Sequence, residues 1–344
     1  MKAFKLTGIG EMDLFTVPDP EIISDHDVLI RMKTLGVCGS DIHYYNTGKI
    51  GSQIVKYPFT VGHEGAGEVI KTGATAGRVK TGDKVAIDPA MPCYECEQCK
   101  AGRTHTCTNL KFLGTPGQAE GCLSEYIVMP EQSLFPVSSD LSYVDCALSE
   151  PLSIGYYAVE KASPSKDSTI GILGSGPIGM SVLLSSMVLG GKEFFVTDKI
   201  DNRLELAKIS GAHWTGNPLK TNIVTDIKKQ CPNLLDVVYE CCGQQEAMDQ
   251  AIDLLKPGGK LMIIGIPETD YWKFSVDKLR HKEISIINVR RQLDCVQPVL
   301  DLIRTKEMNP SIMVTHRFSF SETKKAFDLV SSYQDGVMKA MIDF

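Results

Sequence analysis

The segment 174–179, which reads GSGPIG, restricts the fold of this chain more than any other stretch of its sequence. It follows an apolar run and precedes a helix-like run that begins at Pro177. A strand, a G-x-G-x-x-G turn and a helix in this order form the phosphate-binding crossover of a dinucleotide-binding domain. Gly174 permits the tight turn, Gly176 lets the backbone approach a pyrophosphate, and Gly179 lets helix and strand pack closely. The phosphates would lie at the helix N-terminus, where backbone N–H groups and the helix dipole favour an anion.

An acidic residue stands at the place where such a domain holds the adenosine ribose. The strand-like run 192–198 ends at Asp198, nineteen residues beyond Gly179, and Arg203 follows about one helical turn later. A carboxylate there accepts hydrogen bonds from the ribose hydroxyls and repels a 2′-phosphate. The sequence therefore predicts NAD as the cofactor. The alternative is an ordinary strand–turn–helix unit with an aspartate on its surface.

The character of the chain changes near residue 167. Before it, short strand-like runs such as 27–37 and 65–73 are bounded by glycine, aspartate and proline. After it, strand-like and helix-like runs alternate, which indicates a parallel sheet with helices on both faces. The predicted class is α/β: a β-rich domain and a doubly wound parallel-sheet domain. The alternating runs are 168–174, 177–190, 192–198, 201–211, 235–243, 247–259, 260–267 and 281–289.

Charge and apolar patterning exclude two classes of partner. The formal net charge is −6, so no basic field favours nucleic acid. The first ten residues contain no apolar signal-peptide core, and no apolar run reaches the length of a membrane span. We therefore expect a cytoplasmic protein without nucleic-acid or membrane partners.

Four of the eleven cysteines lie close together, in the pattern C-x2-C-x2-C-x7-C. In a reducing compartment such a cluster indicates a metal site rather than disulfides. Four thiolates close a tetrahedral shell around zinc and leave no position for a substrate. The cluster, within about residues 88–110, is therefore predicted to be a structural zinc lobe. Free surface thiols and an iron–sulfur cluster are the alternatives. The four ligands would be Cys93, Cys96, Cys99 and Cys107.

A second group of metal-type residues is spread over the first 150 positions. A catalytic zinc needs about three protein ligands and one open position. Cys38, His63 and one glutamate, either Glu64 or Glu150, would satisfy that requirement. Taken singly, a buried cysteine or a hydrogen-bonded structural histidine is the simpler interpretation. Their joint occurrence with a dinucleotide fold favours the catalytic one.

These motifs together resemble those of the zinc-dependent medium-chain alcohol dehydrogenases. The resemblance runs nearly end to end, through GVCGSD, GHEGAGEVIKTGATA, the four-cysteine lobe and GSGPIG. Within that family the segments GTPGQAEGC and ALSEPLSIGYYA are most similar to sorbitol (polyol, L-iditol) dehydrogenases. The resemblance implies a GroES-like catalytic domain over 1–152, a Rossmann NAD-binding domain over 153–289, and a return segment, 290–344, that completes the first domain. It also implies a homo-oligomer, with a tetramer favoured over a dimer.

The resemblance assigns roles residue by residue. Cys38, His63 and Glu64 fall on the ligands of the catalytic zinc, and Glu150 falls on a glutamate that approaches the metal or its water. The remaining assignments are Ser40 and His43 as the proton relay, Tyr44, Glu150 and Arg291 as substrate contacts, and Gly174, Gly176, Pro177, Ile178, Gly179, Asp198, Arg203, Gly265, Ile266 and Val289 as cofactor contacts.

Charge balance favours Glu64 over Glu150 as the ligand. One thiolate and one carboxylate neutralise Zn²⁺, whereas a second carboxylate would make the site anionic and a weaker Lewis acid. Glu150 is then expected to hydrogen-bond the zinc water or the substrate. The alternative is an exchange, in which Glu150 binds the metal while Glu64 turns away.

The implied activity is oxidation of a secondary alcohol of a polyol, such as sorbitol or xylitol, to the ketose with NAD+ and two zinc ions per chain. One segment departs from the family pattern: 289–292 reads VRRQ, and Gln292 replaces a tyrosine beside the arginine. The alternatives are therefore related dehydrogenases of threonine, butanediol, a sugar acid or a sugar phosphate. A dinucleotide-binding protein without catalysis is the alternative from another class.

Overall fold

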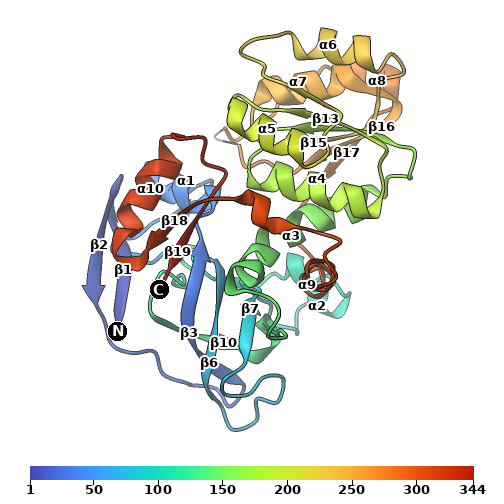
Figure 1. Cartoon of the computed structure of the whole chain (residues 1–344). Coiled ribbons are helices and arrows are strands. Elements are labelled where there is room, and N and C mark those ends of the chain that lie inside the picture. Colours follow the sequence, from blue (N-terminus) through green and yellow to red (C-terminus); the bar gives the residue numbers. More distant parts are fainter. Residues whose placement is uncertain (268) are drawn as a thin grey trace. The chain divides into compact units, whose positions relative to one another are not determined.

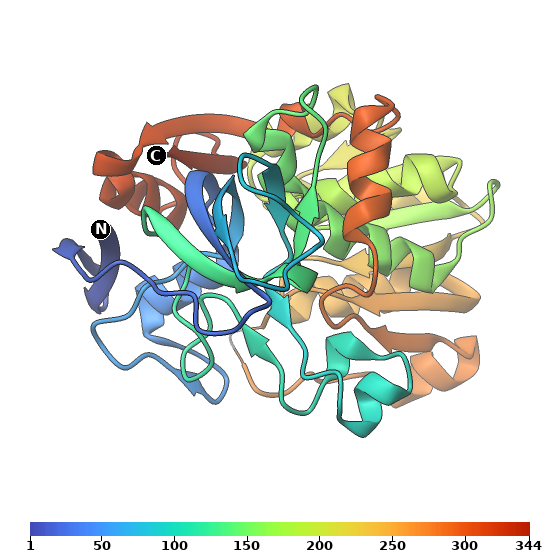
Figure 2. The same ribbon diagram turned by 90° about the horizontal axis from the view of Figure 1, so that it is seen from below.

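The computed structural model describes residues 1–267 and 269–344, which form two compact units (Figure 1 and Figure 2). The first unit comprises Met1–Glu150, Val296–Lys306 and Val314–Phe344, and the second comprises Pro151–Cys295 and Glu307–Met313. Within the described residues, no helix combines the length and the apolar character needed to cross a bilayer. The domain boundaries expected near residues 152 and 289 stay predictions.

The first unit is built on a seven-stranded sheet with β3 (Asp27–Gly36) near its centre. The strand order is β11-β7-β6-β3-β19-β18, and β10 also pairs with β3. All these pairs are antiparallel except β18 with β19. The other strands are β6 Glu64–Thr72, β7 Lys84–Ile87, β10 Tyr126–Pro130, β11 Leu134–Pro136, β18 Val314–Ser319 and β19 Lys339–Asp343.

The alternation of buried apolar residues with other residues along β3 explains how this sheet forms. Val28, Ile30 and Met32 are spaced by two, so they point to one face and are buried in the apolar core of the first unit. At its end, β3 places Gly36 opposite Glu64 of β6 on one side and opposite Met341 of β19 on the other. The first and last parts of the chain therefore meet at this strand.

Short elements surround the sheet of the first unit. In Figure 1, α10 lies beside α1 and the strands β18 and β19. Their bounds are β1 Lys2–Gly8, β2 Glu11–Thr16, α1 Gly39–Thr47, β4 Lys49–Ile50, β5 Gln53–Ile54, β8 Ala90–Met91, α2 Glu97–Lys100, β9 Lys111–Phe112, α9 Val296–Arg304 and α10 Thr323–Ser331.

The second unit is a six-stranded, fully parallel sheet in the order β14-β13-β12-β15-β16-β17. In Figure 1, α7 and α8 lie on one face of this sheet and α4 lies on the other. This is the predicted doubly wound α/β arrangement, which is confirmed. The bounds are β12 Thr169–Leu173, α4 Pro177–Leu189, β13 Glu193–Thr197, α5 Asp201–Ile209, β14 Trp214–Gly216, α6 Ile223–Gln230, β15 Leu235–Glu240, α7 Gln245–Leu254, β16 Leu255–Ile263, α8 Val276–Lys282 and β17 Ser285–Asn288. The helix α3, Tyr143–Ala162, belongs in part to each unit.

One of the predicted runs spans two elements of the structure. Only the first part of the helix-like run 247–259 is helical, because α7 ends at Leu254 and β16 begins at Leu255. Pro257 has no backbone N–H to continue a helix. Gly258 follows with a φ of +76°, which a helix does not contain.

Candidate active site

The glycine turn of the second unit has the close approaches that its sequence predicts. Gly174, at the end of β12, has a φ of +98°, and a Cβ added there would lie 2.8 Å from Cβ of Cys242. A Cβ added to Gly179 would lie 1.9 Å from the backbone oxygen of Gly174. Side chains are therefore excluded at both positions, and α4 begins at Pro177 with its N-terminus against the turn.

The structure brings Asp198 and Arg203 to the same turn. The Asp198 carboxylate accepts hydrogen bonds from the backbone N–H groups of Ser175, at 2.7 Å, and Ile200, at 2.8 Å. Arg203 is buried, and its Nη1 lies 3.3 Å from the position of a Cβ added to Gly176. An acid fixed beside a G-x-G-x-x-G turn is the arrangement that holds an adenosine ribose.

The other predicted cofactor contacts lie at the same edge of the parallel sheet. Gly265 and Ile266 follow β16, and Val289 follows β17. A Cβ added to Gly265 would lie 2.3 Å from the backbone nitrogen of Gly243, so the loops after β15 and β16 are in close contact. Arg291 also belongs to the second unit, and its predicted role toward a substrate stays a prediction.

Sequence analysis missed Glu240, which stabilises one of these loops. Glu240 is fully buried at the end of β15. Its carboxylate accepts hydrogen bonds from the backbone N–H groups of Cys242, at 2.8 Å, and Gly243, at 2.6 Å. The available signal was an acidic residue that ends an apolar strand, as Asp198 does.

In the first unit, three predicted ligands come together. The ligand atoms of Cys38, His63 and Glu64 all lie within 4.8 Å of one another. Cys38 is the N-cap residue of α1, and Glu64 is the first residue of β6. The strand pair β3–β6 and the helix that follows β3 therefore position the set.

Asp41 orients two members of this set. Its carboxylate accepts hydrogen bonds from the backbone N–H of Cys38, at 3.2 Å, and from that of Gly62, at 3.1 Å. The same carboxylate lies 3.4 Å from Nδ1 of His63, which leaves Nε2 as the ring nitrogen for a metal. Burial lowers the pKa of His63, but the charges of Asp41 and Cys38 outweigh that effect and hold the pKa well above its usual range.

A buried lysine holds the carboxylate of Glu64, and sequence analysis missed it. Nζ of Lys339 donates to Oε1 of Glu64 at 2.8 Å, to Oε2 at 2.5 Å and to the backbone oxygen of Val37 at 3.2 Å. Both side chains are almost completely buried. Gly36 makes room for the pair, because a Cβ there would lie 2.4 Å from Oε2 of Glu64. The available signal was a lysine inside the apolar strand KAMID.

Glu150 is buried close to this set but is not one of the three grouped ligands. Burial raises its pKa to about 7, and the negative charge of Glu64 adds to the shift. The positive charges of His63 and Lys339 act in the opposite direction. Burial therefore favours the protonated form of this carboxyl group, and its role toward the zinc water or the substrate stays a prediction.

The first turns of α1 carry the predicted relay and substrate residues. Oγ of Ser40 donates to Sγ of Cys38 at 3.4 Å. His43 is half-buried on the same helix. Tyr44 is buried, and its hydroxyl donates to Oε1 of Gln53 at 2.9 Å, a contact that sequence analysis did not anticipate.

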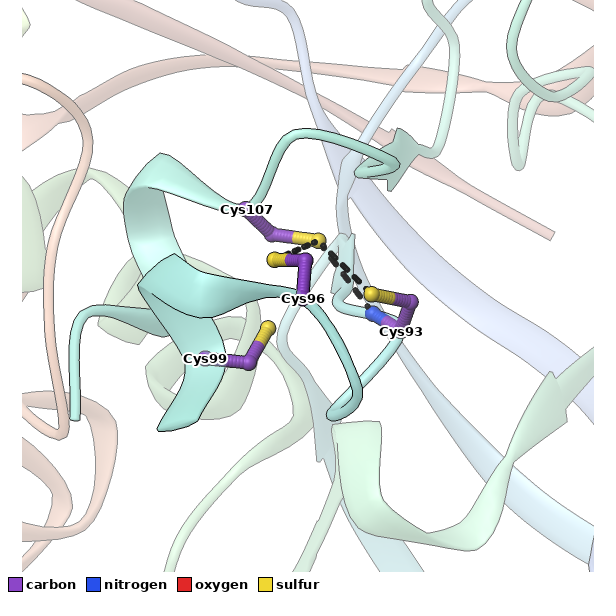
Figure 3. A group of neighbouring side chains, drawn as sticks. All are labelled: Cys93, Cys96, Cys99 and Cys107. Carbon is purple, nitrogen blue, oxygen red and sulfur yellow. Dashed lines mark hydrogen bonds between the residues drawn. The ribbon is translucent and has the colours of Figure 1, made fainter. Parts of the chain in front are cut away.

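The structure groups the four cysteines of the predicted zinc lobe. Figure 3 shows the side chains of Cys93, Cys96, Cys99 and Cys107 directed toward one another. Their four sulfur atoms lie within 4.8 Å of one another. Sγ of Cys107 is 3.4 Å from that of Cys93 and 3.8 Å from that of Cys96. Backbone N–H groups of Cys99 and Thr108 lower the pKa of Cys96 to about 5, which favours its thiolate.

Both groups fit zinc. Sulfur atoms at the corners of a tetrahedron with Zn–S bonds of about 2.3 Å lie about 3.8 Å apart, close to the spacings in the lobe. These spacings are much longer than the roughly 2 Å of a disulfide bond. The thiolate, imidazole and carboxylate of the other group form a three-ligand set of the catalytic type. Which glutamate binds that metal stays a prediction, since Lys339 holds both oxygens of Glu64.

Comparison with known proteins agrees with this arrangement. Residues 24–139 match the profile of the alcohol dehydrogenase GroES-like domain, and residues 177–305 match that of the zinc-binding dehydrogenases. The chain is 33% identical to sorbitol dehydrogenase of Bacillus subtilis over 343 residues, which cover 99% of this chain and 97% of the relative. It is 32% identical to sorbitol dehydrogenase 1 of Saccharomyces cerevisiae over 348 residues, with the same coverages, 99% and 97%.

Solved structures show the same fold. An Escherichia coli oxidoreductase/dehydrogenase of unknown specificity superposes with a TM-score of 0.94 at 27% identity, covering 99% of this chain and 98% of that one. A zinc-binding dehydrogenase from Sinorhizobium meliloti, bound to NADP, superposes with a TM-score of 0.90 at 27% identity, covering 100% and 99%. An alcohol dehydrogenase from Escherichia coli, complexed with NADH, gives a TM-score of 0.90 at 26% identity and the same coverages.

Proposed function

Because this chain is an enzyme of the zinc-dependent alcohol dehydrogenase family, we propose that it oxidises a secondary alcohol of a polyol to a ketose with NAD+. The observation that carries the proposal is the grouping of Cys38, His63 and Glu64, a donor set of the catalytic zinc type. The sorbitol dehydrogenases among the relatives match almost the whole chain and favour a polyol as the substrate.

The residues of the first unit can carry the proton chemistry. A zinc ion held by Cys38, His63 and Glu64 would supply a Lewis acid that lowers the pKa of the substrate hydroxyl. Ser40, which contacts Cys38, would accept the hydroxyl proton as it passes its own proton along the relay, and His43 on the same helix would release a proton to solvent. Histidine suits that outer position because its ordinary pKa lies near neutrality.

Other residues would bind the hydroxyl groups of the substrate. The buried carboxyl group of Glu150, with its raised pKa, can donate or accept a hydrogen bond near neutral pH. The Tyr44 oxygen would accept a hydrogen bond from a second hydroxyl group of the substrate. Arg291 is proposed as a third contact, on the strength of the family resemblance alone.

The cofactor is proposed to be NAD rather than NADP. Asp198 is fixed at the glycine turn by two backbone N–H groups, so a 2′-phosphate there would meet a carboxylate that cannot easily move away. NAD+ supplies the hydride acceptor. Structures of similar proteins contain either NADP or NADH, and kcat/KM values measured with NAD+ and with NADP+ test the preference.

We also propose two zinc ions per chain, one in each group of ligands, and a homo-oligomer with four subunits. Residues 1–152 and 290–344 would form the catalytic domain and residues 153–289 the NAD-binding domain. These assignments rest on the family resemblance, together with the sulfur spacing in the lobe.

An absorbance assay at 340 nm tests the proposed reaction. The purified protein is mixed with NAD+ and, in turn, with sorbitol, xylitol, L-idonate, threonine, 2,3-butanediol and a sugar phosphate. We expect the highest kcat/KM with a polyol. A higher value with L-idonate would favour a sugar acid, the substrate named for a relative from Vitis vinifera that is 30% identical over 314 residues. Absence of turnover with every compound would refute a dehydrogenase of this substrate class.

A further inference from the structure

A polar pair joins α1 to the hairpin that follows it. Gly48 ends α1 in the left-handed conformation, with a φ of 69°. The chain then forms the two-stranded hairpin of β4 and β5, in which Ile50 pairs with Gln53. The hydroxyl of Tyr44 in α1 donates to Oε1 of Gln53 at 2.9 Å.

The helix geometry directs Tyr44 toward the ligand end of α1. Residues four apart share one face of a helix, so Tyr44 lies on the same face as Ser40. Ser40 itself contacts Sγ of Cys38 at 3.4 Å. Side chains of a helix also lean toward its N-terminus, which here is Cys38. The Tyr44 side chain, only 3% exposed, therefore leans toward the metal-binding end, and Gln53 reaches the same place from the hairpin.

We infer that Gln53 determines the specificity of the enzyme for substrates with several hydroxyl groups. This inference rests on the proposed function. Because the Tyr44 proton is donated to Gln53, the phenolic oxygen can only accept a hydrogen bond from a substrate. The carboxamide of Gln53 carries two N–H donors, so the pair combines an acceptor and donors within one hydrogen bond's length.

A polyol complements this pair, because each hydroxyl group both donates and accepts. An apolar alkyl chain in the same place would remove water from the two polar groups without replacing its hydrogen bonds, which is unfavourable. Sites that are built to bind a substrate hydroxyl discriminate strongly against analogues that lack it. Gln53 is therefore a specificity residue that acts both directly and by orienting Tyr44.

The test compares two substrates in a set of variants. The best polyol of the panel and 2-butanol, a secondary alcohol with one hydroxyl group, are assayed with the zinc-loaded wild type, Gln53→Leu, Gln53→Glu, Tyr44→Phe and Gln53→Leu/Tyr44→Phe. Gln53→Leu is expected to lower kcat/KM for the polyol about ten- to hundredfold, the usual loss for one or two buried hydrogen bonds, and that for 2-butanol less than about threefold. Gln53→Glu keeps the acceptor for Tyr44 and should give an intermediate loss. The double variant should lose less than the product of the single losses, because the two residues interact.

A matched control and two readouts separate the outcomes. Gln132→Leu replaces an exposed glutamine and should match the wild type on both substrates. Zinc content and melting temperature are measured for every variant. Equal losses of activity on the polyol and on 2-butanol would overturn the inference, as would an unchanged polyol kcat/KM in Gln53→Leu. A wild type without activity on any polyol would instead refute the proposed function itself.

Discussion

The buried ion pair between Lys339 and Glu64 allows a quantitative prediction about metal and stability. Both charged groups are almost completely removed from water, and Nζ of Lys339 makes three hydrogen bonds, two to Glu64 and one to Val37. Lys339→Met removes the cation, keeps most of the side-chain volume and leaves the Glu64 carboxylate buried without its partner. Glu150, a second buried acid nearby, adds to the negative charge around Lys339.

The expected cost follows from the burial of the pair. Removal of one partner from a buried ion pair costs about 3–5 kcal/mol. Against the roughly 5–15 kcal/mol that stabilises an ordinary domain, this loss is large. In the zinc-loaded protein the metal would compensate the charge of Glu64, so we expect a loss of only about 1–2 kcal/mol there.

Denaturant unfolding measures the loss of stability in the zinc-free protein and in the zinc-loaded protein. The free energy of unfolding is determined for wild type and Lys339→Met, with zinc bound and after removal of zinc by a chelator. Lys325→Met serves as the control, because Lys325 forms an exposed ion pair with Glu322 at 3.0 Å and should contribute less than about 1 kcal/mol. Adding Glu64→Gln to Lys339→Met should restore part of the loss, since no uncompensated charge remains.

Two results would refute this reasoning. A loss below about 1 kcal/mol in the zinc-free protein would mean that the pair is not desolvated as the structure indicates. An equal loss with and without zinc would mean that the metal does not compensate Glu64, and would favour Glu150 as the ligand.

Four further predictions follow from individual residues. Cys96→Ser should reduce the zinc content from two ions to one and lower the melting temperature, because a closed metal site stabilises the fold; metal analysis that finds one zinc in the active wild type would contradict it. Asp198→Ser should reduce the preference for NAD over NADP by about tenfold or more in kcat/KM, from a wild-type preference above about tenfold, and equal wild-type values would contradict the assignment. Glu64→Gln should weaken zinc retention and Glu150→Gln should keep the metal but lose activity on polyols, and loss of the catalytic zinc from Glu150→Gln alone would reverse the two roles. In zinc-free protein, the pKa of Glu150 rises from its ordinary 4.5 to about 7 on folding, so the folded state binds more protons than the unfolded state between these values. The free energy of unfolding should therefore fall as the pH rises from about 4.5 to about 7, and Glu150→Gln should remove this fall in unfolding curves measured at several pH values.

The sequence by itself determined the features whose residues are neighbours along the chain. The glycine turn at 174–179, the four-cysteine lobe and the start of α4 at Pro177 depend on local spacing and backbone conformation. A short turn between a strand and a helix sets the distance between the backbone groups at its two ends. A spacing of three residues between two cysteines likewise limits the distance between their thiols, before the rest of the chain folds. For the same reason the alternation of runs after residue 167 was sufficient to predict the parallel sheet. It did not locate the end of α7, where the local pattern of apolar residues continues into β16.

Only the tertiary structure decided which distant groups surround the proposed catalytic metal. Lys339 and Glu64 are 275 positions apart and meet because β3 pairs with β6 on one side and with β19 on the other. The register at Gly36 sets their separation, and the missing side chain of Gly36 leaves room for both. The hydrogen bond between Tyr44 and Gln53 likewise depends on how the hairpin folds back on α1. Sequence spacing carries no information about such contacts, because strand pairing between remote segments is set by burial of the whole sheet and not by any local pattern.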